Sequence, residues 1–275
     1  MNDIPPVLDQ VDRPRPKWRW AVHLSILLAY VLAIGLLSLG TSDASKASEP
    51  AMPKDLRGLF IMAVENMVFF LFLFGLACAF SRPKPGELLL RWRGGLKPIL
   101  LGFVYSVALR LAIIIMTVII VAPVVAIRGE EKVNELRPKV EHLVNMEALK
   151  DPAYFLFTTT AISFGLAGFR EELWRAGVLA GFVALSPVFF GTRKGMFIAI
   201  LLAAAVFGLG HLPQGVSAVF LTAALGLGLG LIMVRHQSIW EAVIAHGFFD
   251  ATTFAMLFVV VKFTPNLLKQ FGVSG

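Results

Sequence analysis

The sequence predicts an all-α protein, a polytopic transmembrane bundle of about eight helices. Hydrophobic residues make up 57% of the 275 positions and charged residues only 16%, which is far less charge than a soluble domain carries. Apolar runs of about 18 residues or more recur from end to end, and each can cross the hydrocarbon core. These runs are too long and too evenly apolar for barrel strands, so the backbone must be satisfied within helices.

The net charge of +7 does not predict a nucleic-acid partner. In membrane proteins basic residues cluster in loops and anchor the cytoplasmic side. Four basic residues precede the first apolar run, Arg13, Arg15, Lys17 and Arg19. They predict a multi-pass protein of the cell membrane with its N-terminus in the cytoplasm. The single cysteine, Cys78, lies in an apolar run and cannot form an intramolecular disulfide.

The N-terminal half is expected to contain a tail and three spans. Residues 1–18 are polar and proline-rich and predict a disordered basic tail. The run 20–39 is longer than the ~7–15 apolar residues of a signal peptide and predicts a retained anchor. Two further spans are expected at 58–80 and 98–127. Residues 19–153 therefore form an N-terminal three-span region.

Residues 128–153 interrupt the apolar pattern. Basic and acidic residues alternate here, and Val133, Leu136 and Val140 recur at helical spacing. We interpret the segment as an amphipathic helix in the loop, solvated on one face. The alternative is a gate or lid.

The C-terminal half is expected to form the catalytic membrane core, residues 154–263, followed by a tail at 264–275. The apolar stretch 154–190 is too long for one span and barely long enough for two. Two helices meeting near Glu171 is the preferred interpretation. One long bent helix is the alternative, and it lowers the total from eight spans to seven. Three more runs follow, at 195–210, 216–234 and 239–263.

Ionisable side chains within the spans are functional candidates, because a charge in the hydrocarbon region is costly. Some of them allow a structural interpretation. Glu65 and Arg110 carry opposite charges at similar places on neighbouring spans and predict a structural ion pair. His23 lies near the end of its run and can extend its ring to the interface.

Six polar residues of the C-terminal half are harder to ascribe to packing. They are Glu171, Glu172, Arg175, His211, His246 and Asp250. Glu171 and Arg175 lie four residues apart and share a helix face, whereas Glu172 points to another. The same spacing separates Phe207 from His211 and His246 from Asp250. Arg175 can hold one carboxylate ionised while the other stays free for chemistry.

These residue types match a hydrolytic site. A carboxylate can take a proton from water and return it to a leaving group. Histidines can bind a metal, or hold the water and stabilise an oxyanion. The chain lacks HExxH, in which two histidines share one helix, so we predict no metal cofactor. If a metal such as zinc is present, its expected ligands are Glu171, His211 and His246.

The residues resemble the pattern of the CPBP family of intramembrane proteases. This family contains the CAAX prenyl endopeptidases and bacterial relatives of the Abi type, linked to bacteriocin immunity. Its pattern is EExxxR, then FxxxH, then HxxxN or HxxxD. The corresponding stretches are Glu171-Glu172-Leu-Trp-Arg175, Phe207-Gly-Leu-Gly-His211 and His246-Gly-Phe-Phe-Asp250. The resemblance covers residues 155–260 and leaves the three N-terminal spans unmatched.

The resemblance implies an intramembrane endopeptidase that acts on a membrane-associated protein or peptide. In the family the first glutamate activates the water and two histidines complete the site, here Glu171, His211 and His246. The third motif ends in Asp250, where the eukaryotic prenyl proteases have asparagine. An asparagine amide can donate to an oxyanion, and an ionised aspartate cannot. Asp250 therefore favours the bacterial branch over prenyl-protein substrates.

Two other functions stay open as alternatives. The chain could be a catalytically silent membrane scaffold or immunity protein that retains the site. It could also be a proton-coupled transporter that uses the same glutamates and histidines as a relay. The candidate polar groups cluster in one half and no repeat pairs the halves, which argues against transport. The expected partners are the lipid bilayer and the substrate.

Convergence of the catalytic side chains is a geometric requirement of this interpretation. Glu171, His211 and His246 lie on three separate segments, yet all must reach one water. His211 ends its run, whereas His246 lies about 10 Å into its own at ~1.5 Å per residue. We therefore expect a broken or re-entrant path near Pro213 or residues 226–230.

Overall fold

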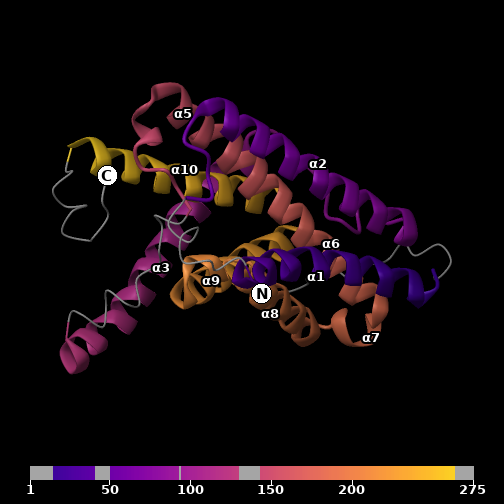
Figure 1. Ribbon diagram of the computed structural model, residues 1–275. Helices are drawn as coiled ribbons and strands as arrows, with labels where there is room; N and C mark the ends of the chain where they lie inside the picture. The colour runs from indigo at the N-terminus through magenta and orange to yellow at the C-terminus, as the bar shows by residue number, and fades with distance from the viewer. Residues whose placement is uncertain (1–14, 41–49, 93, 130–142, 264–275) are drawn as a thin grey trace.

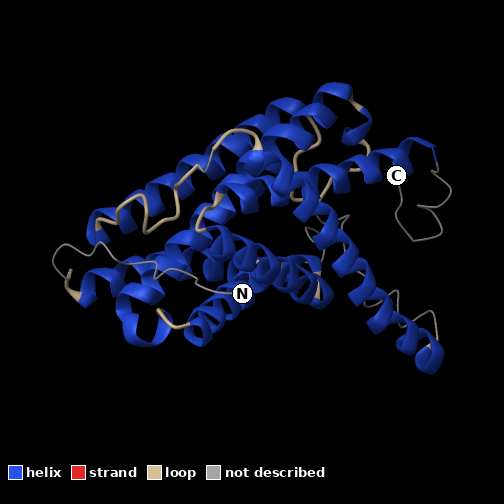
Figure 2. Cartoon of the chain, turned by 180° about the vertical axis from the view of Figure 1, so that it is seen from behind, coloured by secondary structure: helices blue, strands red, loops and turns tan. Residues whose placement is uncertain are grey.

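The computed structural model describes residues 15–40, 50–92, 94–129 and 143–263 (Figure 1). Within these ranges the protein is helical and contains no β-strand, and its long helices pack side by side (Figure 2). The predicted all-α class is therefore confirmed. The predicted tails fall largely outside the described residues, although α1 already begins at Lys17.

Five helices of the described part are long and apolar enough to cross a membrane. They are α2 (Leu56–Ser81), α3 (Lys97–Arg128), the continuous helix Pro152–Leu185, α9 (Val216–His236) and α10 (Trp240–Phe263). Two further apolar helices are α1 (Lys17–Gly40) and α8 (Arg193–Leu209). The ends of these helices lie within a few residues of the predicted spans, because the apolar runs and their polar flanks mark both ends.

The stretch after residue 151 differs from the preferred prediction of two helices meeting near Glu171. Here α5 (Pro152–Phe157) continues into a π-helix, η3 (Thr158–Arg170), and then into α6 (Glu171–Leu185). These form one run of 34 residues, followed by the short α7 (Pro187–Phe190). A helix longer than the hydrocarbon core is accommodated by tilting, so length alone did not require a break.

The described residues 143–151 include a short 3-10 turn, η2 (Ala148–Lys150). Val144 and Leu149 are buried in a cluster with Leu59 and Tyr154. The rest of the predicted amphipathic helix, residues 130–142, lies outside the described residues.

The π-helix makes the most extensive contact with α10, while α8 packs on α9 and α1 packs on α2 and α6. Glycine allows the backbones of η3 and α10 to approach closely. A Cβ placed on Gly168 would lie 2.7 Å from the Val243 carbonyl oxygen, and one on Gly247 would lie 2.3 Å from the Phe164 ring. This contact brings the end of η3 beside the helix that carries His246.

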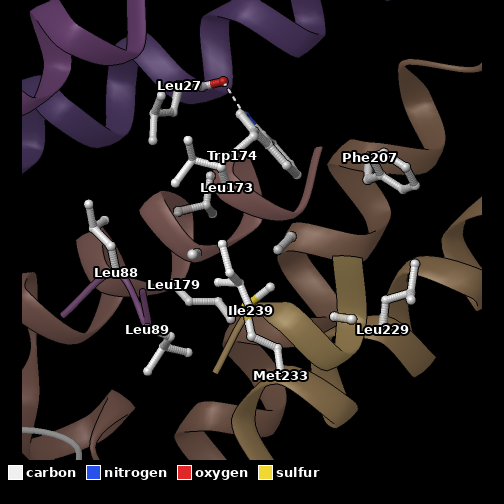
Figure 3. Packing of buried hydrophobic residues seen from close by; sticks show 14 of the residues in the cluster. Leu27, Leu88, Leu89, Leu173, Trp174, Leu179, Phe207, Leu229, Met233 and Ile239 are labelled. Atoms are coloured by element: carbon white, nitrogen blue, oxygen red, sulfur yellow. Dashed lines mark hydrogen bonds between the residues drawn. The ribbon is translucent and has the colours of Figure 1, made fainter. Parts of the chain in front are cut away.

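The main apolar core joins α6 to its neighbours (Figure 3). Trp174 is buried, and its Nε1 donates a hydrogen bond to the Leu27 carbonyl of α1 at 2.8 Å. Leu173 and Leu179 point from α6 toward Ile239 and Met233 (Figure 3). The core therefore fixes α6, and with it the paired glutamates, against helices from both ends of the chain.

The prediction that His23 reaches the interface is wrong. Its side chain is fully buried among α1, α2 and α6. The ring bonds the Ser81 hydroxyl at 2.9 Å and the Gly177 carbonyl at 3.2 Å. Two partners on neighbouring helices satisfy both ring nitrogens, so the ring has no need of water.

The predicted pair of Glu65 and Arg110 is also wrong. The reason is topological: α3 packs on α10 and α9, so Arg110 reaches residues of α10. Glu65 is exposed on α2. The second half of α3 projects away from the other described helices (Figures 1 and 2).

We predict that Gly168→Ala destabilises the protein by about 1–3 kcal/mol, the usual cost of overpacking. The added Cβ meets backbone atoms of Val243 and Ser163, which cannot rotate away. Gly165→Ala is the matched control in the same helix, because nothing lies within 4 Å of a Cβ there. Thermal unfolding in detergent measures both variants. An equal effect of the two substitutions would contradict the close contact.

Candidate active site

A cavity of about 430 Å³ lies between α1, α2, η3, α10 and the connection from α8 to α9. Its polar lining includes Arg170, Glu171, His211, His246 and Asp250. The volume falls in the ~300–1,000 Å³ range of ligand pockets. The Asp250 side chain is 30% exposed, so water reaches this wall of the cavity.

His211 reaches the cavity because the chain breaks after α8. The helix ends at Leu209, and a 3-10 turn, η4 (Leu212–Gln214), leads into α9. Pro213 lies in this turn, which joins the two predicted spans, whereas α9 runs unbroken through residues 226–230. A re-entrant path near Pro213 stays a prediction. The Nδ1 atom of His211 donates to the Phe207 carbonyl at 3.0 Å. Since the ring then faces the cavity, Nε2 is its nitrogen available for chemistry.

His246 is held by the buried glutamate of the pair. The carboxylate of Glu172 accepts a hydrogen bond from His246 Nδ1 at 3.0 Å. His246 Nε2 then lies 3.8 Å from Glu171 Oε2 and 3.9 Å from Asp250 Oδ2. Both separations exceed a direct hydrogen bond and suit groups that share one water.

Arg175 pairs with Glu172, and not with Glu171 four residues away as their shared face suggested. The side chains of Arg175 and Glu172 are completely withdrawn from solvent. Residues three apart also share a helix face, and the neighbouring helix favours this partner. The Arg175 guanidinium lies over the Phe207 ring, 4.7 Å from its centre, where Gly226 leaves space for its Nη2.

Glu171 has a different counter-charge, Arg170. The Arg170 Nη2 lies 2.8 Å from Glu171 Oε1, which leaves Oε2 directed at His246. Sequence reasoning missed Arg170, because adjacent residues do not face each other in an α-helix. These two residues stand where the π-helix ends and α6 begins, and their long side chains nevertheless meet. The only feature of the sequence that points to Arg170 is its position directly before the paired glutamates.

The expected catalytic residues therefore converge. The Phe207 ring centre lies 4.9 Å from that of His211 and 6.2 Å from that of His246. Glu171, His211, His246 and Asp250 all line one cavity, with Glu172 and Arg175 buried behind it. Their catalytic roles stay a prediction. Tyr30 also lines this cavity from α1, and no pattern in the sequence links it to the other residues.

The alternative zinc site fits this geometry poorly. Among the described residues, no three His, Cys, Asp or Glu side chains form a group that could hold a metal ion. Glu171 is paired with Arg170, and each histidine already commits Nδ1 to a protein acceptor. We therefore derive no step through a metal.

The family model for the type II CAAX prenyl endopeptidase Rce1-like proteins matches residues 152–252. The matched residues are similar to this family and are called the Rce1-like segment. It starts at the helix that leads to Glu171 and ends just after Asp250, so it contains all six predicted site residues. The match confirms the predicted resemblance to the CPBP and CAAX proteases over these residues.

The helices α1, α2 and α3 lie outside the Rce1-like segment. No curated protein and no solved structure matches the chain. The contacts of the N-terminal helices with the site are therefore drawn from this structure alone.

Arg175→Ala is expected to cost about 3–5 kcal/mol, because it leaves the buried Glu172 charge unpaired. Arg175→Lys should recover part of this loss, since it restores the charge without the planar fork. Thermal unfolding and folded yield in detergent measure both variants. An Arg175→Ala protein as stable as the wild type would show that the pair does not support the fold.

Proposed function

We propose that this protein is an intramembrane endopeptidase of the glutamate type, acting on a membrane-associated protein or peptide. In it Glu171 activates the water that hydrolyses the peptide bond. The geometry around Glu171 supports this role most directly. One carboxylate oxygen is held by Arg170, and the other lies 3.8 Å from His246 Nε2 in a cavity of substrate size.

Glu171 has the position of a general base. Its Oε1 is held by the Arg170 guanidinium at 2.8 Å, and an ionised carboxylate can accept a proton. Glu171 takes a proton from water while the water oxygen bonds to the substrate carbonyl carbon. The carbonyl electron pair moves to its oxygen. When the carbon–nitrogen bond breaks, Glu171 returns the proton to the leaving nitrogen.

His246 is the residue best placed to orient the water. Its Nδ1 donates to Glu172, and Arg175 neutralises that carboxylate. Such a carboxylate partner fixes the tautomer and the ring orientation. The neutral ring then accepts a hydrogen bond at Nε2, whereas the protonated ring donates from both nitrogens. The neutral ring can therefore hold the water through Nε2 while Glu171 takes the other proton of the water.

The oxyanion needs donors other than Asp250, because an ionised aspartate only accepts hydrogen bonds. His211 faces the same cavity with a free Nε2 and can donate there in its protonated form. Arg170 also lines the cavity. As Glu171 accepts a proton it loses the charge that held Arg170, and the negative charge appears on the substrate oxygen. We assign stabilisation of that oxygen to these cavity donors.

The rest of the cavity suits an apolar peptide segment. Its lining away from the charged residues includes Met52, Leu143, Ile162, Leu166 and Phe254. Such walls accept aliphatic or aromatic side chains of a substrate that lies in the bilayer. With Asp250 in the third motif, we favour peptides of the bacterial branch over prenylated proteins. The cell membrane and a cytoplasmic N-terminus are part of the same proposal.

Glu171→Gln should lower turnover by at least ~10²-fold, because it keeps the shape and removes the base. Glu65→Gln is the matched control, since it makes the same change at an exposed position outside the cavity. Comparison of membrane peptides from cells carrying each variant identifies the substrate, and purified enzyme then gives the rate. Unchanged cleavage by Glu171→Gln would exclude Glu171 as the base. Equal peptide profiles for wild type and Glu171→Gln would favour the silent scaffold.

Activity is expected to survive chelation, because the described ligand-type side chains do not form a metal group. Purified active protein should be dialysed against a strong zinc chelator, and its metal content and turnover measured together. Stoichiometric zinc, lost together with activity and restored with it, would overturn this expectation. It would make Glu171, His211 and His246 the ligands of a metalloprotease site.

A further inference from the structure

Arg110 is a charged residue within α3, outside the Rce1-like segment, and it binds the helix that carries the active site. Its Nη2 donates to the Phe249 carbonyl. The same nitrogen lies 2.7 Å from Thr252 Oγ1 and 2.9 Å from Thr253 Oγ1. Its guanidinium carbon lies 4.3 Å from the centre of the Phe249 ring. All these contacts fall on one turn of α10.

This turn forms part of the cavity wall. Phe249, Asp250 and Thr253 line the cavity, and Arg110 is not among the lining residues. Asp250 directly follows the residue whose carbonyl Arg110 binds. His246 lies one turn earlier on the same helix. Arg110 therefore acts on the site from outside the cavity, through the backbone of α10.

The turn offers Arg110 a preformed set of acceptors. Thr252 Oγ1 donates to the Phe248 carbonyl and Thr253 Oγ1 donates to the Phe249 carbonyl, each at 2.8 Å. A hydroxyl has one donor and two acceptor lone pairs. Since both hydroxyl protons are already directed at the backbone, lone pairs remain to accept from Arg110. The hydroxyls of Thr252 and Thr253 and the Phe249 carbonyl thus form one set of acceptors beside the guanidinium.

Packing alone does not explain why a charged residue, Arg110, lies at this position on α3. Its neighbours Val107 and Leu111 are exposed apolar residues, so the helix presents an apolar surface suited to lipid. A charge there is unfavourable, and such residues mark functional sites by default. The predicted partner Glu65 lies elsewhere. The Arg110 guanidinium instead binds the turn of α10 that contains Asp250.

We propose that Arg110 is a positioning residue of the active site. By binding the turn from Phe249 to Thr253 it fixes Asp250, and through the helix His246, relative to Glu171. Its effect on catalysis rests on the proposed peptidase function, whereas its effect on the order of α10 does not. Arg110 does not line the cavity, so its loss should alter turnover more than substrate affinity.

Arg110→Met tests the proposal, because it keeps much of the length and removes the charge and donors. We expect kcat to fall by about 10–10²-fold, as for a small misplacement of catalytic groups. We expect KM to change little. Hydrogen exchange of the backbone amides in residues 246–254 should become faster. Arg110→Lys keeps the charge but not the planar guanidinium. It should restore part of kcat and part of the slow amide exchange.

Tyr105→Phe is the matched control on the same helix. Tyr105 OH bonds His236 Nε2 at 2.8 Å, so this variant also removes a polar contact of α3, but on α9. Its kcat and its exchange in residues 246–254 should match the wild type.

A double variant with Asp250→Asn tests whether Arg110 acts on catalysis through Asp250. If Arg110 acts through Asp250, adding Arg110→Met to Asp250→Asn should cost less than it costs alone, since coupled residues are not additive.

The outcomes distinguish this proposal from the peptidase proposal. If wild type and Glu171→Gln are equally inactive, the peptidase function fails, and the exchange data still decide whether Arg110 orders this turn. Unchanged exchange in residues 246–254 of Arg110→Met overturns the positioning role. Faster exchange throughout α3, α9 and α10 overturns it as well, because it shows a general structural role. Faster exchange confined to the turn, with lowered kcat in an active enzyme, supports it.

Discussion

A buried ion pair between the Arg175 guanidinium and the Glu172 carboxylate stabilises the centre of this protein. Arg175 neutralises Glu172, and Glu172 accepts the Nδ1 hydrogen of His246. Removing either charge would leave the other unpaired in a low-dielectric interior, which costs several kilocalories per mole. The pair therefore constrains three elements at once, since α6 carries both charges, α10 carries the imidazole and α8 supplies the Phe207 ring over Arg175.

The two adjacent glutamates have different environments because of this arrangement. Glu172 is buried and neutralised, and it serves to orient His246. Glu171 faces the cavity, is 18% exposed and shares its charge with Arg170. A helix places neighbouring residues about 100° apart, at 3.6 residues per turn, so one carboxylate can point inward and the other toward water.

The N-terminal helices contribute to the site although they lie outside the Rce1-like segment. Helix α1 receives the Trp174 hydrogen bond at the Leu27 carbonyl and places Tyr30 in the cavity wall. Helix α3 reaches α10 through Arg110. His23 of α1 bonds the Gly177 carbonyl of α6, and Arg110 of α3 bonds residues of α10, so both polar side chains attach their helices to the Rce1-like segment. Glycine at Gly168 and Gly247 lets η3 and α10 approach closely enough to complete the site.

The sequence by itself determined the helical membrane class, the ends of most helices and the set of cavity residues carried by the three motifs. Apolar runs must form helices in lipid, and i, i+4 spacing marks a shared face wherever the helix is regular. It did not determine which acid pairs with Arg175, the continuity of the helix from Pro152 to Leu185, or the partners of His23 and Arg110. These depend on which helices become neighbours. Local spacing carries no information about the acceptors that a helix meets from a distant part of the chain, so only the tertiary structure decided them.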